Sequence, residues 1–178
     1  VLALWPLRDV ITGVPVVSTM TGHSGAGRSR GTTEFLFAEG ANDARAYVPV
    51  GHRHTPEMEQ ALGIPVRFTP HMVPMPRGMY ATVQVPVSTG SELETLFRRA
   101  YREEPFVRLS TRIPTSKATL GSNRCDIHVR YDERTGHAVI LSALDNLMKG
   151  ASGAALQNMN LMLGLPETAG LPRDGIWP

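Results

Sequence analysis

Two histidines and an arginine stand together in a short polar segment that suits proton transfer and anion binding. Residues 51–57 read Gly-His-Arg-His-Thr-Pro-Glu, so His52 and His54 flank Arg53. Histidine titrates near neutral pH and serves as a general acid or base, and a guanidinium beside it binds anionic groups. A His-x-His pair on an extended strand can also bind a metal, but no third ligand lies near it in the sequence. An exposed polar corner without a function is the remaining interpretation.

A loop of small residues follows the apolar, β-branched run at 14–20. Residues 24–28 read Ser-Gly-Ala-Gly-Arg. Glycines there allow close backbone approach, and successive N–H groups can cradle an anion that Arg28 also binds. A tight turn that merely needs glycine is the alternative. The pattern is not G-x-G-x-x-G, so it does not predict a dinucleotide-binding fingerprint.

Two further polar residues lie at predicted junctions. Arg77 is held between prolines in the segment 74–79, and a fixed guanidinium is what a carboxylate or phosphate clamp needs. Asn146 lies where a predicted strand passes into a helix, a place that favours anions and where an Asn can cap the helix or bind an amide. A solvated Arg77 and a capping Asn146 are the structural alternatives.

The elements that position these residues are interspersed strands and helices. A hairpin implies antiparallel pairing, so the sequence predicts an α+β domain with a mixed, largely antiparallel sheet and helices on one face. The expected strands are 14–20, 46–50, 66–73, 79–87, 106–110, 124–132 and 137–144, and the expected helices are 55–62, 91–103 and 149–163.

The first strand of the predicted hairpin alternates polar and apolar residues with a period of two. Arg124, Asp126, His128 and Arg130 should therefore share one face, which we expect to be exposed to water. Cys125 lies on the other face, and a buried, unreactive thiol is the expectation for it.

Composition excludes several classes of protein. The chain has 178 residues, 42% of them hydrophobic, which is enough to bury a core in one domain. A formal charge of +2 without basic runs does not favour nucleic-acid binding, and no apolar stretch is long enough to span a bilayer. A single cysteine fits a reducing, cytoplasmic location. The chain starts in an apolar run at Val1, which leads us to expect a fragment of a longer protein.

Taken together and in order, these segments resemble the N-acetyl-gamma-glutamyl-phosphate reductases, within the larger superfamily of aspartate-semialdehyde dehydrogenases. The likeness runs from Leu2 to about Leu171. It rests on Ser-Gly-Ala-Gly-Arg at 24–28, Gly-His-Arg-His-Thr-Pro-Glu at 51–57, Thr-Pro-His-Met-Val-Pro-Met-Pro-Arg-Gly at 69–78, Gly-Ser-Asn at 121–123, Asp-Asn-Leu at 145–147 and Gln-Asn-Met-Asn at 157–160. One departure is Thr-Gly-His at 21–23, where the family more often has Ser-Gly-Val.

The resemblance implies a domain like the C-terminal domain of glyceraldehyde-3-phosphate dehydrogenase. Residues 1–148 would form the catalytic and dimerisation domain, in a homodimer or homotetramer. Residues 149–178 would return to an N-terminal Rossmann domain that binds NADP. The family's nucleophilic cysteine should lie just upstream of Val1, so this chain alone would be inactive.

The resemblance also implies the reaction. The cysteine thiolate attacks the acyl phosphate of the substrate and expels phosphate, and NADPH reduces the resulting thioester to the semialdehyde. The implied catalytic residues are His52 and His54, the substrate-binding residues are Arg28, Arg53 and Arg77, and the cofactor-binding residues are Ser24, Gly25 and Asn146. No metal is implied.

Two other functions remain open. A sister reductase would act on a carrier-bound aminoadipyl or glutamyl phosphate, although Thr55-Pro56 after the second histidine favours the free acetylglutamyl substrate by family likeness. A chain without the cysteine and the nucleotide-binding domain could also serve only as a dimerisation module.

Overall fold

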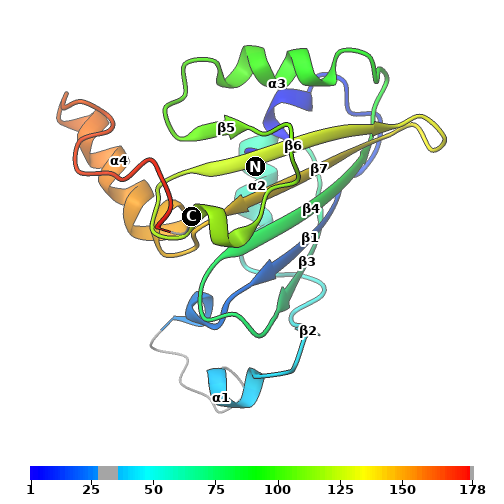
Figure 1. The fold of residues 1–178 in the computed structure, drawn as a ribbon. Helices are drawn as coiled ribbons and strands as arrows, with labels where there is room; N and C mark the ends of the chain where they lie inside the picture. The colour runs from blue at the N-terminus through cyan, green and yellow to red at the C-terminus, as the bar shows by residue number, and fades with distance from the viewer. Residues whose placement is uncertain (28–35, 177–178) are drawn as a thin grey trace.

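One mixed sheet organises the part of the chain that the computed structural model describes, residues 1–27 and 36–176 (Figure 1). Its seven strands are β1 (Val16–Thr21), β2 (Arg45–Ala46), β3 (Arg67–Met72), β4 (Met79–Pro86), β5 (Val107–Leu109), β6 (Cys125–Asp132) and β7 (His137–Leu144). They lie in the order β2-β3-β1-β4-β7-β6-β5. The pairs β1–β3 and β5–β6 are parallel and the other neighbours are antiparallel. The predicted sheet is confirmed.

Helices cover one face of this sheet, as expected. The short η1 (Trp5–Leu7), α2 (Thr55–Leu62) and α3 (Leu93–Tyr101) contribute to a single core with the inward residues of the central strands. The core includes Leu4, Leu7, Val17, Leu62, Val83, Val85, Phe97, Ile127, Val129 and Ile140. Two other helices, α1 (Phe37–Gly40) and α4 (Gly153–Met162), lie beyond the ends of the sheet (Figure 1).

The amphipathic pattern of α3 explains why it lies where it does. Leu93, Phe97 and Tyr101 recur every four residues and are buried, so one helix face points at the core. The Tyr101 hydroxyl donates to the Leu2 carbonyl at 2.7 Å, which holds the N-terminal segment under the helix. Burial raises the pKa of this phenol, so it remains a donor at neutral pH.

The prediction that one face of β6 is wet was wrong at Asp126 and His128, although Arg130 at the end of that face is exposed. Asp126 and His128 are only 1% and 5% exposed. The Asp126 carboxylate forms ion pairs with Arg108 of β5 and with Arg124, and the His128 ring donates from Nδ1 to the Ser110 carbonyl at 2.8 Å. The alternation of polar and apolar residues therefore indicated the right face, but not its exposure. On this face the charges of Asp126 are neutralised by arginines, and the segment that follows β5 covers the polar side chains.

Two element boundaries also differ from the prediction. The strand expected at 46–50 ends at Ala46, because Val48 has φ +44°, a left-handed conformation that no strand residue adopts. The helix expected from 149 begins at Gly153. Before it, Met148–Ser152 forms a wider π-helical turn (η5) with i to i+5 bonds from Gly150 N–H to Asp145 O and from Ser152 N–H to Leu147 O.

Candidate active site

A cavity of about 430 Å³ opens over the carboxyl end of β1, on the face that carries the core. Its floor consists of inward side chains from three neighbouring strands, namely Thr19, Thr21, Phe68, Met72 and Met79. Six of the eight predicted site residues line it, and they are Ser24, Gly25, His52, Arg53, His54 and Asn146. The fold thus brings together segments that are far apart in sequence. Arg28 lies outside the described residues.

The 3-10 turn η2 (His23–Ala26) forms one wall of the cavity. It is hydrogen-bonded to residues 73–78, the proline-rich loop that precedes β4. The N–H groups of Gly22, His23 and Ser24 donate to the carbonyls of Gly78, Met75 and Pro76. The N–H groups of Gly25 and Gly27 donate to the carbonyls of Gly22 and Ser24. An anion cradle made of successive N–H groups is therefore not what this turn provides, since the donors of Ser24, Gly25 and Gly27 are already used.

Gly25 has a packing reason to be glycine, because an added Cβ would stand 2.8 Å from the Thr21 hydroxyl oxygen. Its place in the cavity wall is as predicted, but the reason for the glycine is contact with β1. The role predicted for Gly25 and Ser24, contact with a cofactor, remains a prediction.

His52 is buried, 8% exposed, in the segment that leads into α2. The rings of Tyr47, His54 and Phe68 surround it edge to face, with centroids 5.7, 4.9 and 5.2 Å away. Its carbonyl accepts from Thr55 N–H, and its Nδ1 accepts from His54 N–H at 3.2 Å. Because Nδ1 accepts, the neutral imidazole carries its proton on Nε2, so Nε2 is the ring's donor.

Arg53 and His54 are exposed at the rim of the same cavity. Within residues 1–27 and 36–176 the Arg53 guanidinium has no ion-pair partner. It is therefore available to an anionic ligand, as a substrate-binding arginine must be.

Arg77 does not lie beside Arg53, although the prediction placed both arginines in one substrate-binding site. Its Nε lies 2.8 and 2.7 Å from the two carboxylate oxygens of Asp145, whose side chain is fully buried. It lines a second cavity, of about 550 Å³, on the other side of the proline-rich loop. The structure thus does not bring Arg77 together with the histidines, and it gives this guanidinium a structural partner.

Asp145 is the centre of that junction. Besides Arg77, it accepts N–H bonds from Gly121, Leu147 and Met148 at 2.6, 2.9 and 3.2 Å. Burial alone would raise the pKa of this carboxyl, but these hydrogen bonds outweigh it and hold the pKa below its ordinary value. The carboxylate, rather than Asn146, caps the turn that leads into α4.

Asn146 is 7% exposed and joins two walls of the cavity. Its Oδ1 accepts from Gly78 N–H at 2.6 Å and its Nδ2 donates to the Ser24 hydroxyl at 3.0 Å. Both ends of the amide have protein partners, so its first role is to position Ser24. Its predicted contact with the nicotinamide amide remains a prediction.

Cys125 is buried in the core, as predicted. Burial raises the pKa of its thiol to about 12, so the thiolate that a nucleophile needs does not form at neutral pH. The residue does not line the cavity.

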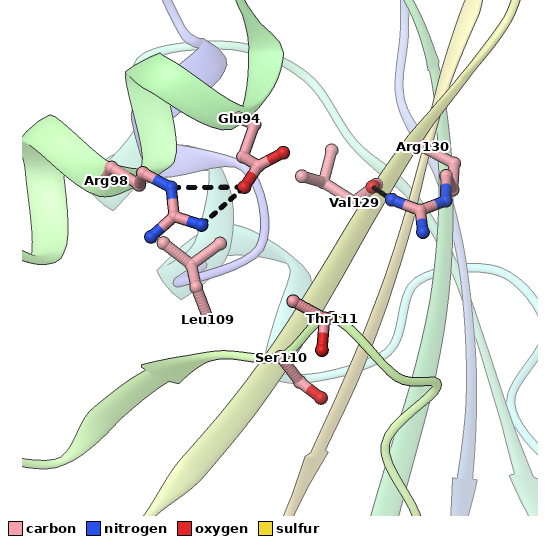
Figure 2. A pocket seen from close by; sticks show the side chains of 7 residues that line it. All are labelled: Glu94, Arg98, Leu109, Ser110, Thr111, Val129 and Arg130. Carbon is pink, nitrogen blue, oxygen red and sulfur yellow. Dashed lines mark hydrogen bonds and ion pairs between the residues drawn. The ribbon is translucent and has the colours of Figure 1, made fainter.

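A smaller cavity of about 170 Å³ lies between α3 and the strands β5 and β6 (Figure 2). The Arg98 guanidinium there is held by Glu94, and Arg130 donates to the carbonyl of its neighbour Val129 at 3.3 Å. No predicted site residue lines this cavity, and the charged groups that do are already bonded to the protein.

Sequence reasoning missed four residues that shape the cavity around His52. Thr19 and Thr21 form part of its floor, and Tyr47 and Phe68 flank the His52 ring. A signal for the threonines was present, because inward positions of β1 change from Val17 to Thr19 and Thr21 along the strand. Polar residues at the inward positions of a strand end indicate that the core gives way to a cavity.

Within the described residues, these features define a domain with a buried histidine and a guanidinium that has no ion-pair partner in one cavity, beside a small-residue turn. The chain belongs to the semialdehyde dehydrogenase dimerisation-domain family, whose model matches residues 1–146. An N-acetyl-gamma-glutamyl-phosphate reductase of Thermus thermophilus is 45% identical over 99% of this chain and 57% of its own length. Another, of Desulforudis audaxviator, is 46% identical over 100% of the chain and 55% of its own length.

The chain thus spans little more than half the length of these relatives. Among solved structures, aspartate semialdehyde dehydrogenase II of Vibrio cholerae has a TM-score of 0.73 at 19% identity, over 92% of this chain and 58% of that one. A probable aspartate-semialdehyde dehydrogenase of Pseudomonas aeruginosa has a TM-score of 0.71, also at 19% identity, over 90% and 58%. At this identity the structures support the fold alone.

The described residues contain no group of three or more His, Cys, Asp or Glu side chains arranged to hold a metal ion. None of their helices has the length and apolar character needed to cross a membrane.

Proposed function

We propose that this chain is the substrate-binding half of a reductase that converts N-acetyl-gamma-glutamyl phosphate to N-acetylglutamate 5-semialdehyde and phosphate with NADPH. The observation that carries the proposal is the cavity in which His52, Arg53 and the Ser24 turn meet. The relatives' names supply the substrate, and the chemistry of the lining agrees with it, since an acyl phosphate is anionic and its reduction needs a proton donor.

The nucleophile in this scheme is a cysteine outside the chain. The sulfur attacks the acyl carbon and the bond to phosphate breaks, which leaves a thioester. NADPH, when bound, supplies the hydride that reduces this thioester. The oxygen of the acyl group then carries negative charge, and the aldehyde forms when sulfur leaves with the electron pair of the carbon–sulfur bond.

His52 has the form that this scheme needs in the direction of reduction. With Nδ1 accepting from His54 N–H, the ring presents Nε2–H as a donor to the acyl oxygen on which charge develops. A base at Nε2 would require the other tautomer and the loss of the His54 bond. The three surrounding rings restrict rotation of the imidazole, which keeps the donor aimed in one direction.

The cavity fits the nicotinamide end of the cofactor only. Ser24, Gly25, Gly150 and Ala151 form a wall of small residues against which a flat ring can lie. In η2, the N–H groups of His23 and Ser24 donate to the proline-rich loop and that of Gly25 donates to the Gly22 carbonyl, so these groups offer no site for the pyrophosphate. We therefore propose that a separate nucleotide-binding half holds the rest of NADP.

The C-terminal segment 149–178 is proposed to contact that half. Leu161, Met162 and Leu163, at the end of α4, are 55%, 85% and 66% exposed. The other side of α4 is anchored by Gln157, whose amide oxygen accepts from Lys149 and Asn123. An anchored helix that exposes apolar side chains at its end suits packing against another domain.

A cytoplasmic location is proposed from the buried, unpaired thiol of Cys125.

The proposed activity is tested with the full-length enzyme. With phosphate and NADP present, it should oxidise free N-acetylglutamate 5-semialdehyde and form NADPH, which is followed by absorbance. Activity that appears only when a carrier protein bears the substrate would establish the sister reductase instead. A full-length protein that turns over neither substrate would leave the dimerisation module as the function.

Homo-oligomerisation is proposed through the sheet face opposite the core. Directly paired residues share a face, which places Val16, Met20, Tyr80, Thr82, Val139 and Leu141 together on it. Val16 and Met20 are 44% and 49% exposed. A second copy of the chain would remove this apolar surface from water, in agreement with the family's description as a dimerisation domain.

Met20→Asp should therefore shift the protein toward monomer. A charge at the centre of an apolar interface is left desolvated and unpaired, so we expect the dissociation constant to rise at least about a hundredfold. Analytical ultracentrifugation over a concentration series measures it. Val50→Asp, at a position that is 87% exposed and away from this face, is the control and should leave the oligomer intact. An unchanged dissociation constant for Met20→Asp would rule this face out as the interface.

A further inference from the structure

We propose that the hydroxyl of Thr19 binds the acetamido group of the substrate and so sets the preference for an acetylated acyl chain. The inference rests on the proposed function. Thr19 lines the cavity and is 6% exposed, so it belongs to the cavity and is otherwise almost completely covered by protein.

The surroundings of Thr19 make a hydroxyl unexpected there. On β1 it follows Val17 on the inward face, and its partners in the neighbouring strands are Pro70 of β3 and Ala81 of β4. All three are apolar. A valine has almost the same shape as threonine and would bury no polar atom, so packing alone gives no reason for the hydroxyl.

Among the described residues, the hydroxyl of Thr19 also has no hydrogen-bond partner. Its backbone carbonyl accepts from the His71 ring at 3.2 Å, but no residue within 1–27 or 36–176 hydrogen-bonds with its side-chain oxygen. The next inward residue, Thr21, differs, because its hydroxyl donates to the Gly22 carbonyl. Thr19 is thus the threonine of the cavity floor whose hydroxyl is left for a ligand.

The polar groups of the proposed substrate can be matched to those of the cavity. The α-carboxylate requires a cation, and the Arg53 guanidinium at the rim has no ion-pair partner within the described part of the chain. The reacting carbonyl requires a donor, which is His52 Nε2–H. The acetamido group is neutral and both donates and accepts, which a hydroxyl does as well. The Thr19 hydroxyl, buried in the cavity floor, meets that requirement.

The position of Thr19 along β1 agrees with a contact between its hydroxyl and the acetamido group. The His52 ring contacts Phe68, which pairs with Val17, so Thr19 lies one inward position further toward the carboxyl end. Two residues of a strand span roughly 6–7 Å. That separation matches a contact with a substituent on the acyl chain rather than with the reacting carbon.

The test compares two substrates in the full-length enzyme. One is N-acetylglutamate 5-semialdehyde, and the other is 5-oxopentanoate, the same chain with hydrogen in place of the acetamido group. We expect Thr19→Val to lower kcat/KM about tenfold for the acetylated substrate, through a higher KM, and to change it less than about twofold for 5-oxopentanoate. The KM for NADP should not change. Thr19→Ser, which keeps the hydroxyl, should restore most of the preference.

Thr95→Val, on the exposed side of α3, is the control and should leave both substrates unaffected. If wild type oxidises the acetylated substrate and Thr19→Val affects both substrates equally or neither, Thr19 does not bind the acetamido group and the proposed function stands. If wild type does not act on the free acetylated substrate at all, the proposed function fails and this inference fails with it.

Discussion

His52→Asn in the full-length enzyme should lower kcat by about two to four orders of magnitude, the usual contribution of a general acid or base. Asparagine can accept the His54 N–H with its side-chain oxygen, so the segment before α2 should keep its conformation. Since the substitution removes a group that acts on the transition state, KM should change little. The rate is measured from NADPH formation with phosphate and N-acetylglutamate 5-semialdehyde.

His54→Asn provides the matched comparison. The His54 ring is exposed, and it is the backbone N–H of this residue that bonds to His52. We expect a fall in kcat of less than about tenfold. A larger loss in His54→Asn than in His52→Asn would assign the acid–base role to His54. A loss below about threefold in His52→Asn would remove His52 from the chemistry.

The sequence predicted the sheet because its strands carry strong local patterns. The hairpin of β6 and β7 has its turn residues where the sequence predicts them, and the helix α2 has Pro56 in its first turn and ends at Gly63, and these are local properties. The sequence could not show which face of β6 is covered. Asp126 can be buried because its carboxylate is paired with Arg108, eighteen residues earlier in the chain. Such a contact depends on the tertiary fold.

The same limit applies to the candidate site. His52, Arg53 and His54 were found because their types and spacing suggest chemistry, and the fold places them in one cavity with Ser24. Arg77 has an equally suggestive context in sequence, but its partner Asp145 lies 68 residues away. Residue type alone cannot separate an arginine that binds a ligand from one that neutralises a buried carboxylate.

Asp145→Ala should lower the free energy of unfolding by about 3–5 kcal/mol. The substitution leaves Arg77 without its partner and removes the acceptor for the N–H groups of Gly121, Leu147 and Met148. These groups lie around the junction between β7 and η5, where little water can replace the carboxylate. Urea denaturation gives the difference. Asp9→Ala, at a carboxylate that is 84% exposed, is the control and should change stability by less than about 0.5 kcal/mol.

The stabilisation from Asp145 should also depend on pH in a defined direction. The folded protein holds the pKa of this carboxyl below its ordinary value, which is about 3.9 in unfolded chains. The contribution of ionisation is therefore fully present above about pH 5, and it is lost as the pH falls through 3.9 toward the lower folded pKa. Asp145→Asn does not titrate, so its deficit relative to wild type should shrink on acidification below about pH 4. A deficit that stays constant from neutral pH to about pH 3 would show that the Asp145 charge contributes no stability, and that its hydrogen-bonding shape alone holds the junction.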